Sequence, residues 1–376
     1  MKLSVMQENL ARGLAVVSRA VSTRGTLPVL ANVLLRTEDG GLKLTATNLE
    51  IGITYWVPGK IETDGATTVP ARLFADLVSS LPGSERVDLE LQGADVLHVR
   101  AGRFATHIKG IDADEFPAIQ TAGERPTTRI AQKVLRRALA ETIFAAASDE
   151  ARPILTGVLA RFEGDRLTLA AADNYRIAVR TVDILDPVES VSVVIPARAL
   201  AELARVLSDT DDPVELVLAQ ARNQVLFHVE GIDLVSRLID GQFPNYQQVL
   251  PQSHATRAEL EREELLRAVR PAALIASSSA NIVKLRIGPD GTADGDAGVM
   301  VTATADVGDY EGAVEAAVEG DGTTIAFNAR YLADVLTNVD ADRFAIELNG
   351  PLSPGVFRPV GDDAYVHVVM PVRTTS

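Results

Sequence analysis

A short stretch that recurs three times along the chain limits the possible folds more than any other feature. Each copy pairs an Ala-Arg dipeptide with a following apolar run typical of a helix. The copies are Val69-Pro70-Ala71-Arg72-Leu73, Ile195-Pro196-Ala197-Arg198-Ala199 and Phe327-Asn328-Ala329-Arg330-Tyr331. The arginines are 126 and 132 residues apart, from position 72 to 198 and from 198 to 330. Solenoid repeats are roughly 20–50 residues long, so a unit of this length predicts a whole domain.

Two further landmarks repeat in the same order at nearly the same spacing. Residues 44–48 match residues 169–173 and then residues 302–306, and Phe116-Pro117 matches Phe243-Pro244. Three landmarks in one order indicate three copies of one domain. The polar stretches near residues 123–127 and 251–254 place the expected domains at 1–126, 127–254 and 255–376.

Within each repeat the pattern predicts a strand, a helix, strands, a second helix and more strands. Apolar residues at helical spacing predict the first helix of the second repeat, and they are Ile130, Val134, Leu135, Ala138 and Leu139. Residues 42–45, 87–91 and 214–218 alternate as strands do. Gly-Asp or Asp-Gly at 39–40, 164–165 and 290–291 predicts hairpin turns. Each domain is therefore expected to be α+β, with antiparallel sheets and two helices.

The basic residues are concentrated on the predicted helices, although the chain of 376 residues has a net charge of −15. Arg129, Lys133, Arg136 and Arg137 are spaced so that one helix would present them on one face. Further candidates for a positive surface are Arg24, Arg72, Arg198 and Arg205.

Two interpretations of this charge pattern remain open. The helices could be ordinary solvated faces, or they could line a surface that contacts phosphates without reading bases. The recurrence of the pattern in three repeats favours the second interpretation. No aromatic residues are clustered among the arginines, which argues against stacking of single-stranded bases.

No motif of a catalytic centre was found. The chain has no cysteine, and its five histidines do not form a His-x-x-x-His or His-Glu-x-x-His pattern. No phosphate-binding glycine loop and no Gly-x-Ser-x-Gly turn is present. We therefore expect no catalytic residue, no metal and no cofactor. The first residues lack the apolar stretch of a signal peptide, and a cytoplasmic location is expected.

Several motifs of the chain resemble those of one known family. They are residues 26–35, Leu44-Thr45-Ala46-Thr47-Asn48-Leu49-Glu50, Thr67-Thr68-Val69-Pro70-Ala71-Arg72, Leu238-Ile239-Asp240-Gly241-Gln242-Phe243-Pro244-Asn245-Tyr246 and Val368-Val369-Met370-Pro371-Val372-Arg373. In this order they are similar to the bacterial DNA sliding clamp, the β subunit of DNA polymerase III, over nearly the whole chain.

The resemblance implies a non-catalytic processivity factor. Two chains of three clamp domains would form a head-to-tail ring, with helices facing the hole and sheets outside. The ring would encircle double-stranded DNA without sequence preference and slide along it. The dimer contact would join Thr106 and Ile108 to Leu274 and Ile275 of the other chain.

The resemblance also implies one peptide-binding pocket between the second and third domains. The replicative polymerase α subunit, the clamp loader, other polymerases and repair proteins would insert short Gln- and Leu-containing motifs there. The matching positions are Leu155, Thr156, Gly157, Asn174, Tyr175, Arg176, Ile177, Pro244, Gln248, Val249, Val368, Val369, Met370, Pro371 and Val372.

The chain departs from the family's pattern at three places. Asn174-Tyr175 stands where the family often has Gly-His or Ser-His, Gln247-Gln248 stands where basic residues are common, and Pro153-Ile154 stands where aromatic residues can touch DNA. Two other functions stay open on the residues alone. They are a protein-interaction scaffold of repeated β-rich domains unrelated to DNA, and an enzyme whose site forms at a domain junction.

Overall fold

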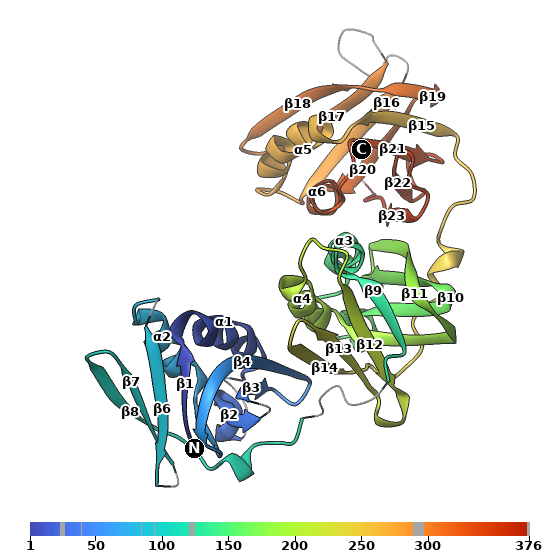
Figure 1. Ribbon diagram of the computed structural model, residues 1–376. Coiled ribbons are helices and arrows are strands. Elements are labelled where there is room, and N and C mark those ends of the chain that lie inside the picture. Colours follow the sequence, from blue (N-terminus) through green and yellow to red (C-terminus); the bar gives the residue numbers. More distant parts are fainter. Residues whose placement is uncertain are drawn as a thin grey trace. The chain divides into compact units, whose positions relative to one another are not determined.

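The computed structural model describes residues 1–22, 27–38, 40–83, 85–93, 95–119, 125–288 and 297–373. The chain forms two compact units (Figure 1). The first unit consists of Met1–Gln132 and Arg205–Leu238, and the second of Lys133–Ala204 and Ile239–Ser376.

The described strands of the first unit join into one twelve-stranded sheet, which two helices accompany. The elements are β1 (Lys2–Met6), α1 (Gln7–Val17), β2 (Asn32–Glu38), β3 (Gly41–Thr47), β4 (Ile51–Thr63), β5 (Ala66–Pro70), α2 (Ala71–Ser80), β6 (Arg86–Gln92), β7 (Val96–Ala101), β8 (Phe104–Lys109), β9 (Thr128–Ala131), β12 (Pro213–Ala219), β13 (Gln224–Val229) and β14 (Ile232–Arg237).

The second unit contains a seven-stranded and a four-stranded sheet in its described part, together with most of α3 and α4. Its elements are α3 (Gln132–Thr142), β10 (Gly157–Ala172), β11 (Arg176–Pro196), α4 (Ala197–Val206), β15 (Thr256–Glu261), α5 (Arg262–Ala276), β16 (Ile282–Gly288), β17 (Gly298–Ala305), β18 (Gly308–Glu315), β19 (Ala317–Gly320), β20 (Thr323–Asn328), α6 (Ala329–Asn338), β21 (Arg343–Leu348), β22 (Gly355–Pro359) and β23 (Tyr365–Val369).

The order of elements recurs three times and confirms the predicted pattern. Each copy starts with a strand that leads directly into a helix, as β1 leads into α1, β9 into α3 and β15 into α5. Further strands follow, and the second helix of each copy (α2, α4 or α6) begins at the repeated Ala-Arg dipeptide. The fold is therefore α+β with antiparallel strand pairs, as the sequence predicts.

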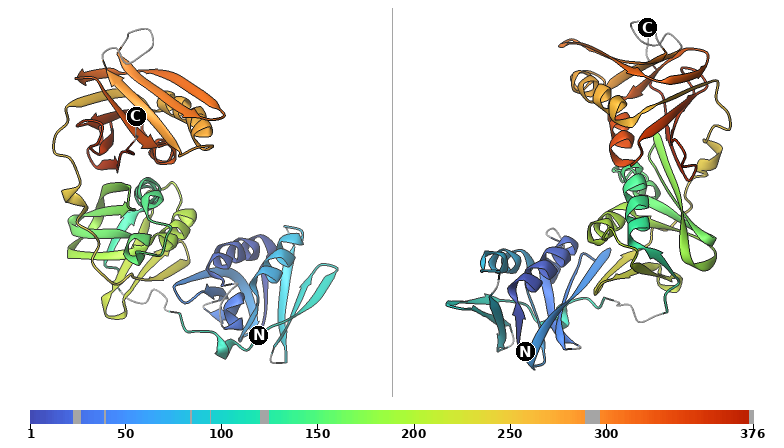
Figure 2. Two further views of the ribbon diagram at one scale, coloured as in Figure 1. Left: turned by 180° about the vertical axis from the view of Figure 1, so that it is seen from behind. Right: turned by 45° about the horizontal axis from the view of Figure 1, so that its top comes forward.

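Helices cover sheets through apolar stripes at helical spacing. In α1 the buried side chains include Leu10, Leu14 and Val17, and the helix lies against β3 and β4. In the second unit α5 lies across β16, β17 and β18, which two further views make visible (Figure 2). No helix in the described part of the chain is long and apolar enough to cross a membrane.

Two strand pairs join one repeat to the next. In the first unit β14 pairs with β4, with Ile232 opposite Tyr55 and Ser236 opposite Ile51. In the second unit β11 pairs with β23, with Arg176 opposite Val369 and Arg180 opposite Tyr365. Both sheets therefore continue across a repeat boundary through backbone hydrogen bonds.

Three local predictions are corrected or limited by the structure. Ile130 and Arg129 lie in β9 and not in the helix, which begins at Gln132. Gly164 has a φ of 63° but lies at an irregular point within β10, so Gly164-Asp165 is not a hairpin turn. Gly40, with a φ of 78°, does connect the hairpin of β2 and β3. The predicted turn at 290–291 lies outside the described residues.

Candidate functional site

Residues from three distant segments meet in one apolar cluster of the second unit. Leu155 belongs to a short 3-10 helix (η5, Pro153–Thr156), Ile177 to the start of β11 and Val368 to β23. These three buried side chains share the cluster with Phe243 and Tyr246, and Val249 packs against it. The strand pairing of Ile177 with Val368 fixes two of the segments side by side. The structure thus brings together the apolar part of the predicted pocket.

Two buried residues of the predicted pocket, Gly157 and Val369, pack against the protein interior and offer little surface to a ligand. A methyl group on Gly157 would lie 2.5 Å from Val194 Cγ1 and 2.8 Å from Ile239 Cδ1, which is closer than atoms pack. Val369 is fully buried. Glycine at position 157 therefore allows β10 to approach these neighbours.

The exposed members of the set lie around this cluster. Asn174, Pro244 and Gln248 are exposed, Tyr175 is 57% exposed, and Thr156, Met370, Pro371 and Val372 are partly buried. The backbone N–H of Met370 donates to the carbonyl of Tyr175 at 2.8 Å. Asp173 Oδ1 accepts from the N–H groups of Tyr175, at 2.7 Å, and Arg176, at 2.9 Å. The tip between β10 and β11 is therefore held by its own hydrogen bonds and by the end of β23.

The guanidinium group of Arg176 is buried and serves neighbouring protein groups. It forms ion pairs with Asp173, at 3.2 Å, and with Asp334 of α6, at 2.5 Å, and it donates to the carbonyl of Phe144 at 2.6 Å. It also lies over the ring of Tyr331, with Cζ 4.6 Å from the ring centroid. We call Asp173, Arg176, Tyr331 and Asp334 the Arg176 cluster.

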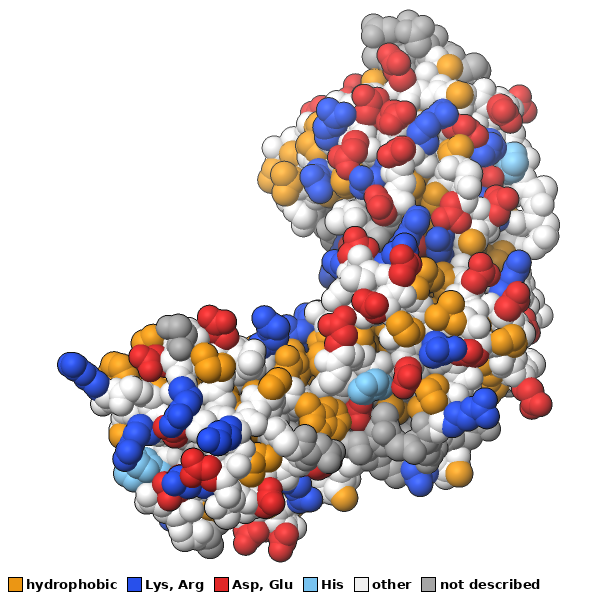
Figure 3. Space-filling view, in the orientation of Figure 1, with side chains coloured by type: hydrophobic (Ala, Val, Ile, Leu, Met, Phe, Trp, Pro, Cys, Tyr) orange, Lys and Arg blue, Asp and Glu red, His pale blue; other side chains and the backbone are white. Residues whose placement is uncertain are grey.

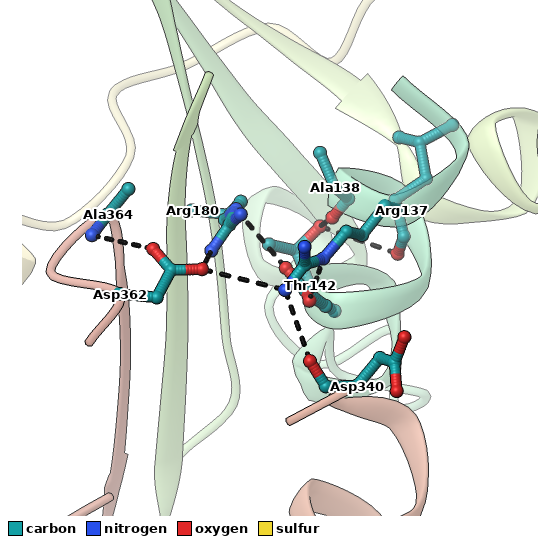
Figure 4. Close-up of polar contacts among 9 residues, drawn as sticks. Arg137, Ala138, Thr142, Arg180, Asp340, Asp362 and Ala364 are labelled. Atoms are coloured by element: carbon teal, nitrogen blue, oxygen red, sulfur yellow. Dashed lines mark hydrogen bonds and ion pairs between the residues drawn. The ribbon is translucent and has the colours of Figure 1, made fainter. Parts of the chain in front are cut away.

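A second group of charges, centred on the buried side chains of Arg180 and Glu141, lies further along β11 (Figure 4). Arg180 Nη1 lies 2.5 Å from Asp362 Oδ2, and Arg180 Nε lies 3.2 Å from Glu141 Oε2. Arg137 of α3 donates to Glu141 at 2.8 Å and to the carbonyl of Asp340 at 3.1 Å. We call Arg137, Glu141, Arg180 and Asp362 the Arg180 cluster. It joins α3 and β11 of the second repeat to the third repeat.

The two carboxyl groups of the Arg180 cluster have pKa values shifted in opposite directions. Burial raises the pKa of Glu141, and the nearby Arg137 and Arg180 offset only part of that rise. Burial also acts to raise the pKa of Asp362, but the hydrogen bond and charge of Arg180, together with the N–H of Ala364 and the charge of Arg137, outweigh it, so this pKa is lowered. The arginines therefore favour the charged form of both carboxylates, whereas burial favours the neutral form.

Sequence reasoning missed the partners of Arg176 and Arg180. Asp334 and Asp362 come from 158 and 182 residues further along the chain. A signal was present, because Arg176 and Arg180 are four residues apart in an apolar strand and therefore face the same side. Two buried arginines on one strand face require acidic partners.

Comparisons with known proteins agree along the whole chain. Models of the DNA polymerase III beta subunit match residues 1–120 (N-terminal domain), 129–245 (central domain) and 247–373 (C-terminal domain). The chain belongs to the bacterial sliding clamps, the beta subunits of DNA polymerase III. Its function is accordingly that of a processivity factor in DNA replication, an accessory subunit of the polymerase. A scaffold unrelated to DNA is therefore set aside.

Individual sliding clamps are similar over their full length. The beta sliding clamp of Synechococcus elongatus is 35% identical, with 100% of both chains covered. The DNA polymerase sliding clamp of Bacillus subtilis is 29% identical, with a TM-score of 0.93 and 100% of both chains covered. The sliding clamp of Pseudomonas aeruginosa bound to griselimycin is 30% identical, with a TM-score of 0.91 and the same coverage.

The basic residues proposed for the clamp's DNA-facing surface fall into four groups. Arg72, Arg198 and Arg205 are exposed on α2 and α4, and Lys133 and Arg136 are exposed on α3. Arg137 is also on α3, but it takes part in the Arg180 cluster. Arg129 lies in β9, opposite Glu215, so its expected place on the helix face was wrong. Arg24 lies outside the described residues. On the face seen in Figure 3, basic and acidic side chains are interspersed.

The residues expected at the clamp's dimer contact differ in accessibility. β8 is the last strand in its sheet order, next to β7 alone. Thr106 is partly buried in β8, whereas Ile108 is only 4% exposed and packs into its own chain. Leu274 on α5 is 75% exposed and Ile275 is partly buried. An exposed leucine and a strand edge are features of a surface that another chain covers.

The described part of the clamp contains no group of three or more His, Asp or Glu side chains suited to hold a metal ion.

Proposed function

We propose that two copies of the chain close head to tail into a ring around double-stranded DNA. The observation that carries the proposal is the position of Arg72, Arg198 and Arg330. Each is exposed and is the second residue of the second helix in its repeat. The positive end of the helix dipole makes a first-turn arginine unfavourable for the helix itself. Contact with phosphates accounts for a charge that local stability does not favour.

In this proposal the ring holds DNA by its topology and carries no chemistry of its own. Three basic helix starts per chain attract the backbone without reading bases, so the ring can slide. The net charge of −15 favours solubility and repels DNA from the remaining surface.

We also propose that the apolar cluster around Leu155, Ile177 and Val368, with Met370 and Tyr175 beside it, binds short peptide motifs. The replicative polymerase α subunit, the clamp loader, other polymerases and repair proteins would supply these motifs. Aliphatic side chains and a pliable methionine next to exposed polar groups suit a peptide with apolar anchors.

The domain boundaries at 126/127 and 254/255 belong to the same proposal, and backbone hydrogen bonds support them. The N–H of Thr127 donates to the carbonyl of Leu216 at 2.7 Å, within the second repeat. The N–H of Ala255 donates to the carbonyl of Leu348 at 2.9 Å, within the third.

Retention on circular and linearised DNA tests the ring. The clamp is loaded by a clamp loader onto nicked circular DNA at moderate salt, and half of the sample is then linearised. A closed ring stays on the circle and leaves the linear form by its ends. Equal, salt-sensitive retention on both forms would show ordinary electrostatic binding and would overturn the proposal.

A further inference from the structure

Two arginines on one face of β11 each reach an aspartate of the third repeat. Arg176 pairs with Asp334 and Arg180 pairs with Asp362, and both guanidinium groups are buried. Both are ion pairs between an arginine and an aspartate, and both connect the second repeat to the third. They differ in what else the arginine contacts.

The pair of Arg176 and Asp334 is connected to the exposed surface beside the apolar cluster. The Arg176 guanidinium lies over the Tyr331 ring, and Tyr331 stacks on Tyr175, with ring centroids 6.2 Å apart and an angle of 23° between the planes. Tyr175 is 57% exposed, and its carbonyl accepts from the N–H of Met370. Asp334 thus reaches the proposed peptide-binding surface through two side chains.

Among the described residues, the pair of Arg180 and Asp362 has no ion pair, hydrogen bond or ring contact with Tyr331 or Tyr175. Its further partners are the side chains of Glu141 and Arg137 on α3 and the backbone N–H of Ala364, which donates to Asp362 Oδ1 at 3.1 Å. Along β11, Arg180 lies opposite Tyr365, four positions from the pairing of Arg176 with Val369. A variant at Asp362 therefore weakens the same junction without releasing Tyr331.

We propose that Asp334 is a positioning residue for the peptide-binding surface. It holds the Arg176 guanidinium in place, and this group in turn orients the Tyr331 ring and the turn at Asp173. Tyr175 and Tyr331 therefore form an aromatic wall that is ordered before the peptide binds. An apolar side chain of the bound peptide packs against this wall. Because two rings are already ordered before binding, the peptide meets a smaller entropic cost. This inference rests on the proposed peptide-binding function.

The test compares Asp334→Asn with Asp362→Asn in the full chain. The affinity of a fluorescently labelled Gln-x-x-Leu peptide is measured by anisotropy, and unfolding midpoints are recorded in parallel. We expect the Kd to rise about tenfold in Asp334→Asn and to change less than about twofold in Asp362→Asn. Asp334→Glu, which keeps the charge, recovers part of the affinity.

Hydrogen exchange gives a second readout that needs no peptide. The N–H groups of Tyr175 and Arg176 donate to Asp173, which is itself paired with Arg176. Their exchange becomes faster in Asp334→Asn and stays unchanged in Asp362→Asn.

Equal effects of the two asparagine variants on the Kd would assign Asp334 a purely structural role and overturn the proposal, as would unchanged exchange at Tyr175 in Asp334→Asn. If the wild-type chain fails to bind the peptide, the proposed pocket is rejected and the positioning role falls with it. Binding by the wild type with no loss in Asp334→Asn rejects the positioning role alone.

Discussion

Arg180 and Asp362 are 182 positions apart in the chain, yet Arg180 Nη1 lies 2.5 Å from Asp362 Oδ2. The pair lies beside the backbone pairing of Arg180 with Tyr365, where β11 meets β23. Glu141 and Arg137 complete the group, so two positive and two negative charges balance at a mostly buried position. The second and third repeats are therefore joined by charge as well as by hydrogen-bonded strands.

Replacing Asp362 by Asn should destabilise the chain by about 1.5–3 kcal/mol, because the buried Arg180 would lose the charge of the hydrogen-bonded partner whose pKa it lowers. Glu163→Gln is the matched control, since Glu163 is 54% exposed and pairs with Arg161 at 3.5 Å, a contact worth less than about 1 kcal/mol. Denaturant unfolding of both variants measures the difference. Similar small losses would show that the cluster contributes little to stability.

Buried His367 should make stability depend on pH. Burial, aided by the charge of Arg176, lowers the pKa of His367 from 6.5 to about 3. Between these values the unfolded chain binds a proton that the folded chain does not, so this contribution is present above pH 6.5 and is lost as the pH falls. His367→Phe should reduce the slope of unfolding free energy against pH by up to about 1.4 kcal/mol per unit. Denaturant titrations from pH 4 to 7 measure it, and an unchanged slope would contradict the assignment.

Met370→Ala should weaken binding of a Gln-x-x-Leu peptide roughly tenfold, because the shorter side chain removes apolar contact at the proposed pocket. Leu185→Ala serves as the control, since Leu185 is 57% exposed on β11 and is not among the pocket residues. Fluorescence anisotropy measures both affinities. An unchanged affinity in the methionine variant would place the peptide elsewhere.

Leu274→Ala combined with Ile275→Ala should shift the chain from the proposed dimer toward monomer, weakening association at least about tenfold. Because Leu274 is 75% exposed, its own replacement should change the stability of the single chain by less than about 0.5 kcal/mol. Leu352→Ala, at a position 65% exposed, should leave the mass in solution unchanged. Light scattering after gel filtration decides the matter, and an unshifted dimer argues against this contact.

Reversing Arg136 and Arg198 to Glu should shorten retention on circular DNA, most strongly at low salt, because fewer phosphates are neutralised. Both residues are exposed on helices, α3 and α4. Arg166→Glu is the control, since Arg166 is exposed on strand β10. Lifetimes are measured on closed circles across a salt series. Equal lifetimes of the variant and the wild type at every salt concentration would show that Arg136 and Arg198 do not contribute to DNA retention.

Local patterns in the sequence predicted the repeat and the order of its elements well, because each rests on short-range spacing. The failure at Ile130 has a physical cause. A strand running directly into a helix keeps Ile130 and Val134 four residues apart, which imitates one helical turn. The Gly164-Asp165 dipeptide suggested a turn, but the positive φ of Gly164 serves an irregularity inside strand β10 instead.

The candidate site was predictable only in part. The resemblance located Leu155, Ile177 and Val368, and the structure brings these apolar residues together. Pairing between distant charges has no local signature, so the partners of Arg176 and Arg180 could not be chosen from among the 51 Asp and Glu residues of the chain. Arg176, expected to line the pocket, directs its guanidinium into the protein.

The pairing of β4 with β14 bears on how the chain is made. During synthesis, residues 51–55 of β4 cannot form this pairing until residues 232–236 of β14, about 180 positions later, have been made. At 5–20 residues per second, a ribosome needs roughly 10 to 40 s to supply that partner. During this time the edge of β4 offers unpaired N–H and C=O groups to any strand nearby, including a neighbouring nascent chain. The β4 edge of the first repeat is therefore paired only after most of the second repeat has been synthesised.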